Sequence, residues 1–288
     1  MTARIALATY ERAPELAPDD HALVPALSAR GIEACPVVWS DPAVDWSRFD
    51  AVVLRSCWDY HLRFAEFRGW LDRLESANAR VMNSTSLVRW NADKRYLIDL
   101  ARRGIATIPT MVVARGLHGD VDQVAAAEGW SRIVVKPTVS ASGYETHAFD
   151  APLDATSREL VGRVTSVGDV LVQPFAHEVP RNGEYSFVFI DGEFTHAAIK
   201  RAGGSEFRVQ IEHGGSVAAV TAPPELIEQA HRVLEVLDET PVYARVDGIA
   251  RGSAFLLMEL ELIEPNLFFE HGPGSAEKMA AAIERRIR

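Results

Sequence analysis

Short apolar runs alternate with helix-like segments along the first 85 residues. Residues 51–54 form a continuous apolar run, which is typical of a parallel strand buried on both faces. Residues 64–76 then carry apolar side chains at helical spacing. Because strands alternate with helices, this part of the chain predicts an open α/β sheet, whose ligands bind beyond the carboxyl ends of the strands.

The C-terminal half predicts antiparallel strands instead. Residues 185–190 and 194–200 flank Asp191-Gly192, which is a strong hairpin signal. Residues 242–249 and 254–262 alternate in the same way around Arg251-Gly252. The predicted fold class is therefore α/β in the wide sense (α+β), with a parallel N-terminal unit and an antiparallel C-terminal sheet.

Composition excludes several classes of protein. The net charge of -10, from 40 acidic and 30 basic residues, argues against nucleic acid as a partner, although a small anion could occupy a local basic pocket. The two cysteines cannot form a disulfide framework or a four-cysteine zinc site. No apolar stretch approaches the roughly 20 residues of a membrane helix. We therefore expect a cytoplasmic protein without a membrane partner.

Lys136 ends a predicted strand over residues 133–135 and precedes a loop of small residues, 138–143. An ammonium group on a rigid strand, beside loop N–H groups, suits a polyphosphate. The same pattern also fits a solvated lysine next to a turn. Lys136 alone therefore does not decide the function.

Three carboxylates in the last two predicted strands are more informative. Glu259 and Glu261 project to the same face because residues i and i+2 of a strand do so, and Asp247 lies on the neighbouring strand. Their hard oxygen atoms suit Mg²⁺ bound to phosphates. A solvent-exposed strand face is the alternative, but the presence of Lys136 favours a metal–phosphate site.

Taken in chain order, these residues resemble the ATP-grasp superfamily, with its glutathione synthetase branch nearest in style. The resemblance runs from about residue 83 to the C-terminus and is carried by Lys94, Lys136, Gln173-Pro-Phe175, Glu184, Asp247 and Glu259-x-Glu261. It implies a carbon–nitrogen ligase that uses ATP and two Mg²⁺ ions and forms ADP. It also implies an N-terminal substrate domain (1–85), linking helices (86–107), a lid domain (108–173) and a C-terminal ATP- and magnesium-binding domain (174–288).

The resemblance assigns expected roles to individual residues. Lys94 and Lys136 would hold the phosphates, and Asp247, Glu259 and Glu261 would hold magnesium. The remaining nucleotide contacts would come from a cover loop (Ser140, Ser142, Gly143), an adenine hinge (Gln173, Phe175) and a ribose site (Glu184, or Glu178 as a second candidate). The chain departs from the family pattern at Glu261, where asparagine is common, and in its serine-rich cover loop.

Three basic residues are candidates for catalysis, since positioned cations stabilise a transferred phosphoryl group. Arg245 shares a predicted strand face with Asp247, Lys200 ends a strand, and Arg208 lies in a predicted loop. For Arg208, a solvated loop charge is an equally good interpretation.

The N-terminal segment resembles a narrower ATP-grasp group, the cyclo-ligases that make D-cycloserine from O-ureido-D-serine. This resemblance is carried by residues 37–42, Asp45-Trp46 and residues 55–60. Candidate contacts to an amino-acid-like substrate are Tyr10, Asp20, Arg55, Trp58, Asp59 and Tyr60. Arg55 could bind a carboxylate through two hydrogen bonds, whereas Trp58 and Tyr60 could simply pack in the core.

The resemblance implies that a substrate carboxylate is activated as an acyl phosphate and then attacked by an amine nitrogen of the same molecule. A ligase that joins a carboxylate to a separate amine, a nucleotide-binding protein without turnover and a kinase acting on a hydroxyl group are the alternatives. ATP-grasp relatives also imply a homo-oligomer.

Overall fold

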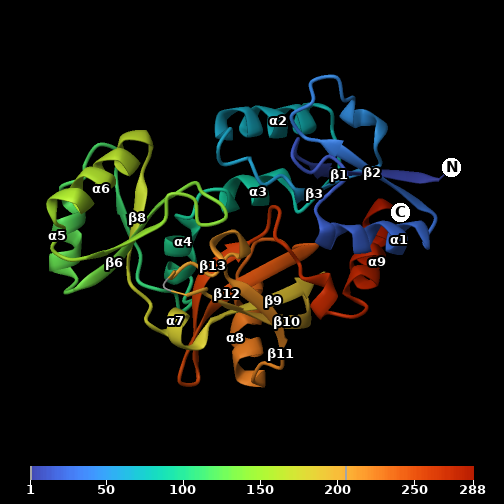
Figure 1. Ribbon diagram of the computed structural model, residues 1–288. Helices are drawn as coiled ribbons and strands as arrows, with labels where there is room; N and C mark the ends of the chain where they lie inside the picture. Colours follow the sequence, from blue (N-terminus) through green and yellow to red (C-terminus); the bar gives the residue numbers. More distant parts are fainter. Residues whose placement is uncertain (1, 205) are drawn as a thin grey trace.

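The computed structural model describes residues 2–204 and 206–288, which form three sheets (Figure 1). The N-terminal sheet has the strand order β2-β1-β3-β4, and all its pairings are parallel. Its strands are β1 (Ala3–Thr9), β2 (Ile32–Val38), β3 (Ala51–Ser56) and β4 (Val81–Met82). All six residues of β3 are buried, as expected for a central strand covered on both faces.

The helical segments of this unit cover the sheet. They are η1 (Pro18–Ala22), α1 (Leu23–Ser28), η2 (Trp46–Arg48) and α2 (Phe64–Ser76). The predicted amphipathic helix is confirmed, because α2 buries Phe67, Trp70, Leu71 and Leu74. These side chains share a buried cluster with Val52 and Leu54 of β3, so that α2 covers one face of this strand.

Two short helices lead from this sheet into the rest of the chain. They are α3 (Thr85–Asn91) and α4 (Tyr96–Arg102). Ser84 caps α3, since its hydroxyl accepts a hydrogen bond from the N–H of Leu87 at 3.2 Å. Lys94 lies in the turn between the two helices, where its N–H donates to the carbonyl of Thr138 at 2.7 Å.

A second sheet, antiparallel in the order β5-β8-β6-β7, projects away from the rest of the molecule (Figure 1). Its strands are β5 (Met111–Val113), β6 (Arg132–Pro137), β7 (His147–Asp150) and β8 (Val170–Pro174), and its helices are α5 (Asp120–Ala127) and α6 (Ala155–Val167). Both helices pack on the same small core as the strands. Lys136 is thus carried by β6, within a folded unit that has its own core.

The third sheet is antiparallel in the order β11-β10-β9-β12-β13. Its strands are β9 (Glu184–Ile190), β10 (Glu193–Arg201), β11 (Ser216–Val220), β12 (Tyr243–Arg251) and β13 (Ala254–Glu261). The predicted hairpin at Asp191-Gly192 is confirmed, and both residues have positive φ, as its turn requires. The accompanying helices are α7 (Glu178–Asn182), α8 (Pro224–Glu235), α9 (Ser275–Ile287), η3 (Ile211–His213) and η4 (Phe269–His271).

The two ends of the chain share one core. Ile5 and Leu7 of β1 belong to the same buried cluster as Met279 and Ile283 of α9. Figure 1 shows α9 beside α1, at the N-terminal sheet. Each sheet lies within one proposed domain, except that β8 ends at Pro174, one residue beyond the predicted boundary at 173. The domain boundaries themselves stay a prediction. Among the helices described, none is long and apolar enough to cross a membrane.

Candidate functional site

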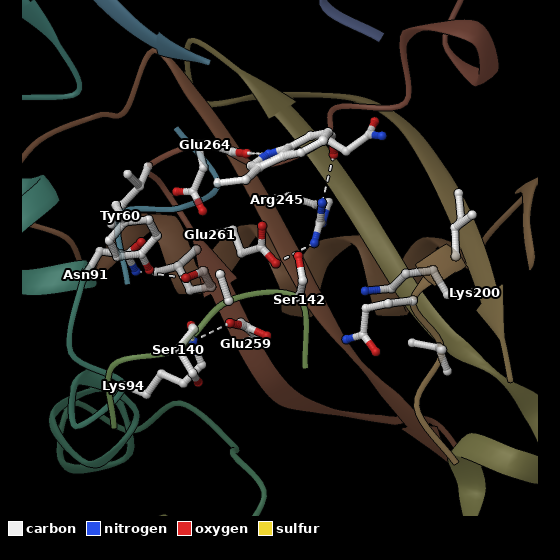
Figure 2. Close-up of a pocket in the computed structure, with 18 of the residues that line it drawn as sticks. Tyr60, Asn91, Lys94, Ser140, Ser142, Lys200, Arg245, Glu259, Glu261 and Glu264 are labelled. Atoms are coloured by element: carbon white, nitrogen blue, oxygen red, sulfur yellow. Dashed lines mark hydrogen bonds and ion pairs between the residues drawn. The ribbon is translucent and has the colours of Figure 1, made fainter. Parts of the chain in front are cut away.

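Two adjoining cavities lie where the three sheets meet. The apolar cavity is lined by Ile108, Val134, Ala176 and Met258, and also by Lys136 and Glu184. The polar cavity is lined by Trp58, Tyr60, Lys200, Arg245, Glu261 and Glu264 (Figure 2). Lys94, Glu259, Gln210 and residues 140–142 line both cavities. The two spaces therefore share one wall.

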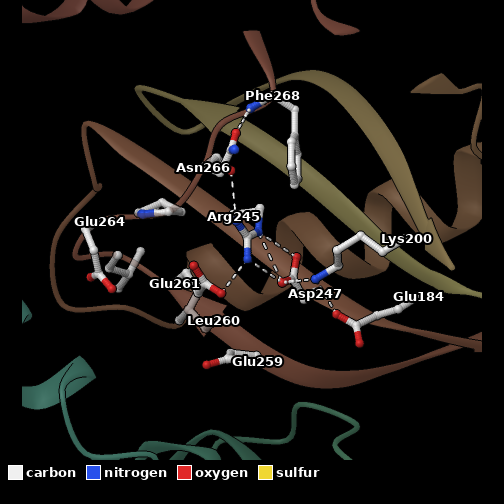
Figure 3. A network of polar contacts seen from close by, with 12 residues as sticks. Glu184, Lys200, Arg245, Asp247, Glu259, Leu260, Glu261, Glu264, Asn266 and Phe268 are labelled. Carbon is white, nitrogen blue, oxygen red and sulfur yellow. Dashed lines mark hydrogen bonds and ion pairs between the residues drawn. The ribbon is translucent and has the colours of Figure 1, made fainter. Parts of the chain in front are cut away.

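A buried ion-pair network forms the floor of the polar cavity (Figure 3). Asp247 of β12 accepts a hydrogen bond from Lys200 at 2.7 Å and from Nη2 of Arg245 at 2.9 Å. Arg245 also pairs with Glu261, and Lys200 pairs with Glu184 at 2.5 Å. The strand order explains this network, because β9 separates β10 from β12 and long side chains bridge that gap.

Opposite effects set the pKa values in this network. Burial alone would raise the pKa of Asp247, but Arg245 and Lys200 lower it to about 2. Burial raises the pKa of Glu261 to about 7, because Glu259 and Asp247 add repulsion that Arg245 offsets only in part. Asp247 is thus a permanent anion, whereas Glu261 carries a charge that a further cation would stabilise.

Lys94 and Lys136 approach the shared wall from different elements. Lys94 is buried and pairs with Glu259 at 2.9 Å, and its ammonium group also donates to the carbonyl of Ser140. Lys136 lines the apolar cavity, and among the described side chains, which are those outside positions 1, 205 and 212, no carboxylate lies within ion-pair distance of it. Burial lowers the pKa of Lys136. An unpaired ammonium beside a cavity favours an anionic ligand there.

The predicted cover loop lies between the cavities. Ser140 and Ser142 line both of them. Gly143 has a φ of +68°, which favours glycine, and a Cβ atom there would lie 3.2 Å from the side chain of Arg208 and 3.3 Å from that of Gln210. The loop is therefore in close contact with Arg208, Gln210 and His213, which lie in the segment between β10 and β11.

The predicted adenine hinge lines the apolar cavity. The ring of Phe175 lies under the Arg132 guanidinium, 4.1 Å from the ring centroid, and also packs beside the ring of Phe207. The N–H of Phe175 donates to the carbonyl of Arg132 at 2.9 Å, and the amide of Gln173 donates to Thr110. These two donors are already engaged within the protein. The contacts that the hinge can still make to an adenine base are therefore with its apolar side chains and with its remaining backbone groups.

The two ribose candidates and Arg208 differ in whether they line a cavity. Glu184 lines the apolar cavity, whereas the second ribose candidate, Glu178, pairs with Arg251 at 2.7 Å and does not line either cavity. Arg208 lines the apolar cavity, and its Nε is buried without a partner among the described residues. The Nε–H of Arg208 is therefore a hydrogen-bond donor beside the cover loop that is available to a ligand.

Only Trp58 and Tyr60 of the six predicted substrate contacts line the polar cavity. Asp59 accepts a hydrogen bond from the indole of Trp39, and Tyr10 packs beside Trp58. Arg55 and Asp20 form a buried pair at 2.8 Å, and Arg55 also donates to the carbonyl of Pro265. The structure therefore gives Arg55 a different contact from the one predicted, because η1 folds back and brings Asp20 onto it.

We expect Asp20→Asn to lower the free energy of unfolding by about 3–5 kcal/mol, because it leaves the buried Arg55 without a counter-charge. Denaturant unfolding checks this. Asp238→Asn is the control, since Asp238 is almost fully exposed and forms an exposed ion pair with Arg103. If Asp20→Asn instead left the stability unchanged and strongly raised the KM for the amino-acid-like substrate, Asp20 would be a substrate contact.

The carboxylates fit magnesium by their chemistry. Protein sites usually hold Mg²⁺ through one or two carboxylates together with substrate phosphates. Glu259 and Glu261 meet this need, since both line the polar cavity, whereas Asp247 is completely buried under Arg245 and Lys200. No described group of three His, Cys, Asp or Glu side chains could hold a metal by itself. Phosphate oxygens would therefore have to complete the coordination.

The sequence analysis missed several residues of the polar cavity. Asn91, Gln210, Glu264 and Asn266 line it, and Oε1 of Gln210 is buried without a partner among the described atoms. Glu264 had a usable signal, because it follows the apolar pair Leu262-Ile263 directly after the strand that bears Glu259 and Glu261. Gln210 had none, since its place depends on how the loop after β10 folds.

Comparisons with known proteins agree with this architecture. The family described as the N-terminal domain of D-cycloserine synthetase DcsG matches residues 5–83. The cycloserine biosynthesis protein DcsG of Streptomyces lavendulae is 35% identical over 290 residues, covering 94% of this chain and 95% of that protein. A crystal structure of D-cycloserine synthetase DcsG matches with a TM-score of 0.91 and 32% identity, over 99% of this chain and 100% of that chain.

A more distant match extends the same fold. A RimK-domain ATP-grasp protein from Sphaerobacter thermophilus matches with a TM-score of 0.72 and 20% identity, over 98% of this chain and 100% of that chain. The predicted α/β ATP-grasp fold is confirmed by these matches.

Proposed function

Because this chain belongs to the DcsG family of ATP-grasp ligases, we propose that it closes the ring of D-cycloserine from O-ureido-D-serine. Membership makes it an ATP-dependent, ADP-forming carbon–nitrogen ligase. The observation that carries the proposal is the wall shared by the two cavities, formed by Lys94, Glu259 and the cover loop. A nucleotide on one side and an acceptor on the other would meet at this wall.

The apolar cavity is the proposed nucleotide site. Its apolar residues and Phe175 would surround the base, and Glu184 would face the ribose. Lys136 and Lys94 would neutralise the phosphates from two sides, since they come from β6 and from the turn before α4. Magnesium, of which two ions are expected, would be held by Glu259 and Glu261 and would neutralise charge on the transferred phosphoryl group.

The polar cavity is the proposed acceptor site. A carboxylate oxygen of the substrate attacks the γ-phosphorus, so that a new bond forms between this oxygen and phosphorus while the bond to ADP breaks. Arg245 and Lys200 lie on the floor of this cavity and would stabilise the developing negative charge. The cover loop and residues 208–213 would exclude water from the acyl phosphate.

Ring closure then uses a nitrogen of the same molecule. The ureido nitrogen bound to oxygen attacks the acyl carbon, a carbon–nitrogen bond forms, and phosphate leaves with one former carboxylate oxygen. One water molecule then hydrolyses the carbamoyl group to carbon dioxide and ammonia. The likeness to proteins named for D-cycloserine synthesis supports this intramolecular route over a ligase that joins two molecules.

The experiment measures ADP release with Mg²⁺ for O-ureido-D-serine alone and for amino acids with and without separate amines. We expect ADP and D-cycloserine in equal amounts from the ureido compound without an added amine. Turnover that requires a separate amine would contradict ring closure and support the intermolecular ligase. A hydroxamate formed on adding hydroxylamine would exclude a kinase that acts on a hydroxyl group.

Phe175→Ala should raise the KM for ATP about 10-fold, because loss of an aromatic wall costs 1–3 kcal/mol of base binding. The KM for the acceptor should stay unchanged, since Phe175 does not line the polar cavity. Steady-state kinetics with each substrate varied in turn checks this, with the melting temperature as a control for folding. An equal rise in both KM values would contradict the assignment of the two cavities.

A further inference from the structure

Glu264 carries a buried carboxylate that no cation or donor among the described side chains contacts. It follows β13, is 9% exposed and lines the polar cavity. Two backbone contacts fix its position, since the indole of Trp58 donates to the carbonyl of Glu264 at 3.1 Å and Arg55 donates to that of Pro265 at 2.8 Å. Within residues 2–204 and 206–288, no hydrogen bond or ion pair reaches its carboxylate.

The cations around this cavity are already engaged. Lys94 pairs with Glu259, Arg245 with Glu261 and Asp247, and Lys200 with Asp247 and Glu184. Burial, together with repulsion from Glu261, raises the pKa of Glu264 to about 8. Glu264 is therefore an acid whose charged form needs a cation that the described part of the protein does not supply.

The surroundings of Glu264 suit an organic ammonium group. Trp58, Tyr60 and Phe268 line the same cavity, and aromatic faces attract cations. In Figure 2, Glu264 and Tyr60 lie at one side of the view and Lys200 lies at the other. The cavity thus places an acid without an ion-pair partner among the described side chains across from Lys200 of its floor, and this arrangement matches a zwitterion better than a simple anion.

We propose that Glu264 binds the α-ammonium group of the amino-acid substrate and makes the enzyme select amino acids over their desamino analogues. The proposal rests on the proposed function only in requiring that the acceptor is an amino acid. An amine held as ammonium has no free electron pair, so it cannot attack an acyl phosphate. Glu264 would therefore also leave the ureido nitrogen as the nucleophile.

The test compares the kcat/KM of two acceptors, O-ureido-D-serine and its desamino analogue 3-(carbamoylaminooxy)propanoate, by ADP release. The wild-type enzyme should prefer the amino compound by about 100-fold, since the analogue leaves a buried carboxylate unpaired. In Glu264→Gln this preference should fall to within about 5-fold, through loss of activity on the amino compound. The KM for ATP should stay within about twofold of the wild-type value.

Two further variants separate binding from folding. Glu228→Gln removes the same charge from an exposed position on α8 and should behave as the wild type. Glu264→Asp keeps the charge and should recover part of the preference. Without ligands, Glu264→Gln should melt at or above the wild-type temperature, because it removes an unpaired buried acid.

Several outcomes would overturn the proposal. An unchanged preference in Glu264→Gln would do so, as would a wild type that accepts both compounds equally. A raised Mg²⁺ requirement with unchanged preference would make Glu264 a metal ligand instead. If the wild type acts only on another amino acid together with a separate amine, the proposed ring closure is wrong. The ratio of kcat/KM values is then measured for that amino acid and its desamino analogue. A loss of this preference in Glu264→Gln would still support the role of Glu264.

Discussion

Glu259→Gln should lower the rate of ADP formation about 1000-fold, because Glu259 is the carboxylate that faces both cavities. The amide keeps the size of the side chain but loses the charge that would bind Mg²⁺ and that pairs with Lys94. The Mg²⁺ concentration for half-maximal rate should rise as well. Quenched measurements of ADP formation at increasing Mg²⁺ check both effects.

The control for Glu259→Gln is again Glu228→Gln, which changes net charge equally at an exposed site. A melting temperature close to that of the wild type would show that the variant is folded. ADP formation at the full rate with an unchanged Mg²⁺ requirement would contradict the assignment of Glu259 as a metal ligand.

Lys136→Met should have opposite effects on stability and activity. Without nucleotide, the variant should melt at a higher temperature, because methionine fills a similar volume and removes a half-buried charge that has no ion-pair partner among the described side chains. With ATP, kcat/KM should fall about 100-fold, because the charge that compensates the phosphates is lost. Thermal melts with and without ATP, combined with ATP kinetics, check the pair of effects.

Lys278→Met is the matched control for Lys136→Met, since Lys278 is exposed on α9 and lines neither cavity. It should change neither property. Two results together would contradict this role: a melting temperature below that of the wild type without ligand, and an ATP-induced increase equal to that of the wild type. Lys136 would then stabilise the fold and not bind the nucleotide.

The fold was largely predictable because its elements have strong local signals. The buried run in β3, the helical spacing in α2 and the turn at Asp191-Gly192 all appear in the structure as predicted. These signals depend on residues that are near in sequence. Helix α6 was not predicted, although Asp154, which accepts a hydrogen bond from the N–H of Ser157, is a residue type that favours a helix start.

The site was predictable only where one strand carries it. Arg245 and Asp247 share a strand face and bind each other as their spacing indicates. Their contact with Lys200 depends on the order of β10, β9 and β12, which the sequence does not specify. Arg55 shows the same limit, because its partner Asp20 comes from a separate segment that folds onto it.

The most direct test of the account is turnover of O-ureido-D-serine labelled with heavy oxygen in both carboxyl oxygens, with no other amine present. Mass spectrometry of the phosphate and of D-cycloserine gives the result. The account predicts one labelled oxygen in each phosphate and one in the ring carbonyl of D-cycloserine. Unlabelled phosphate, or labelled phosphate without D-cycloserine, would contradict carboxylate activation or ring closure, respectively.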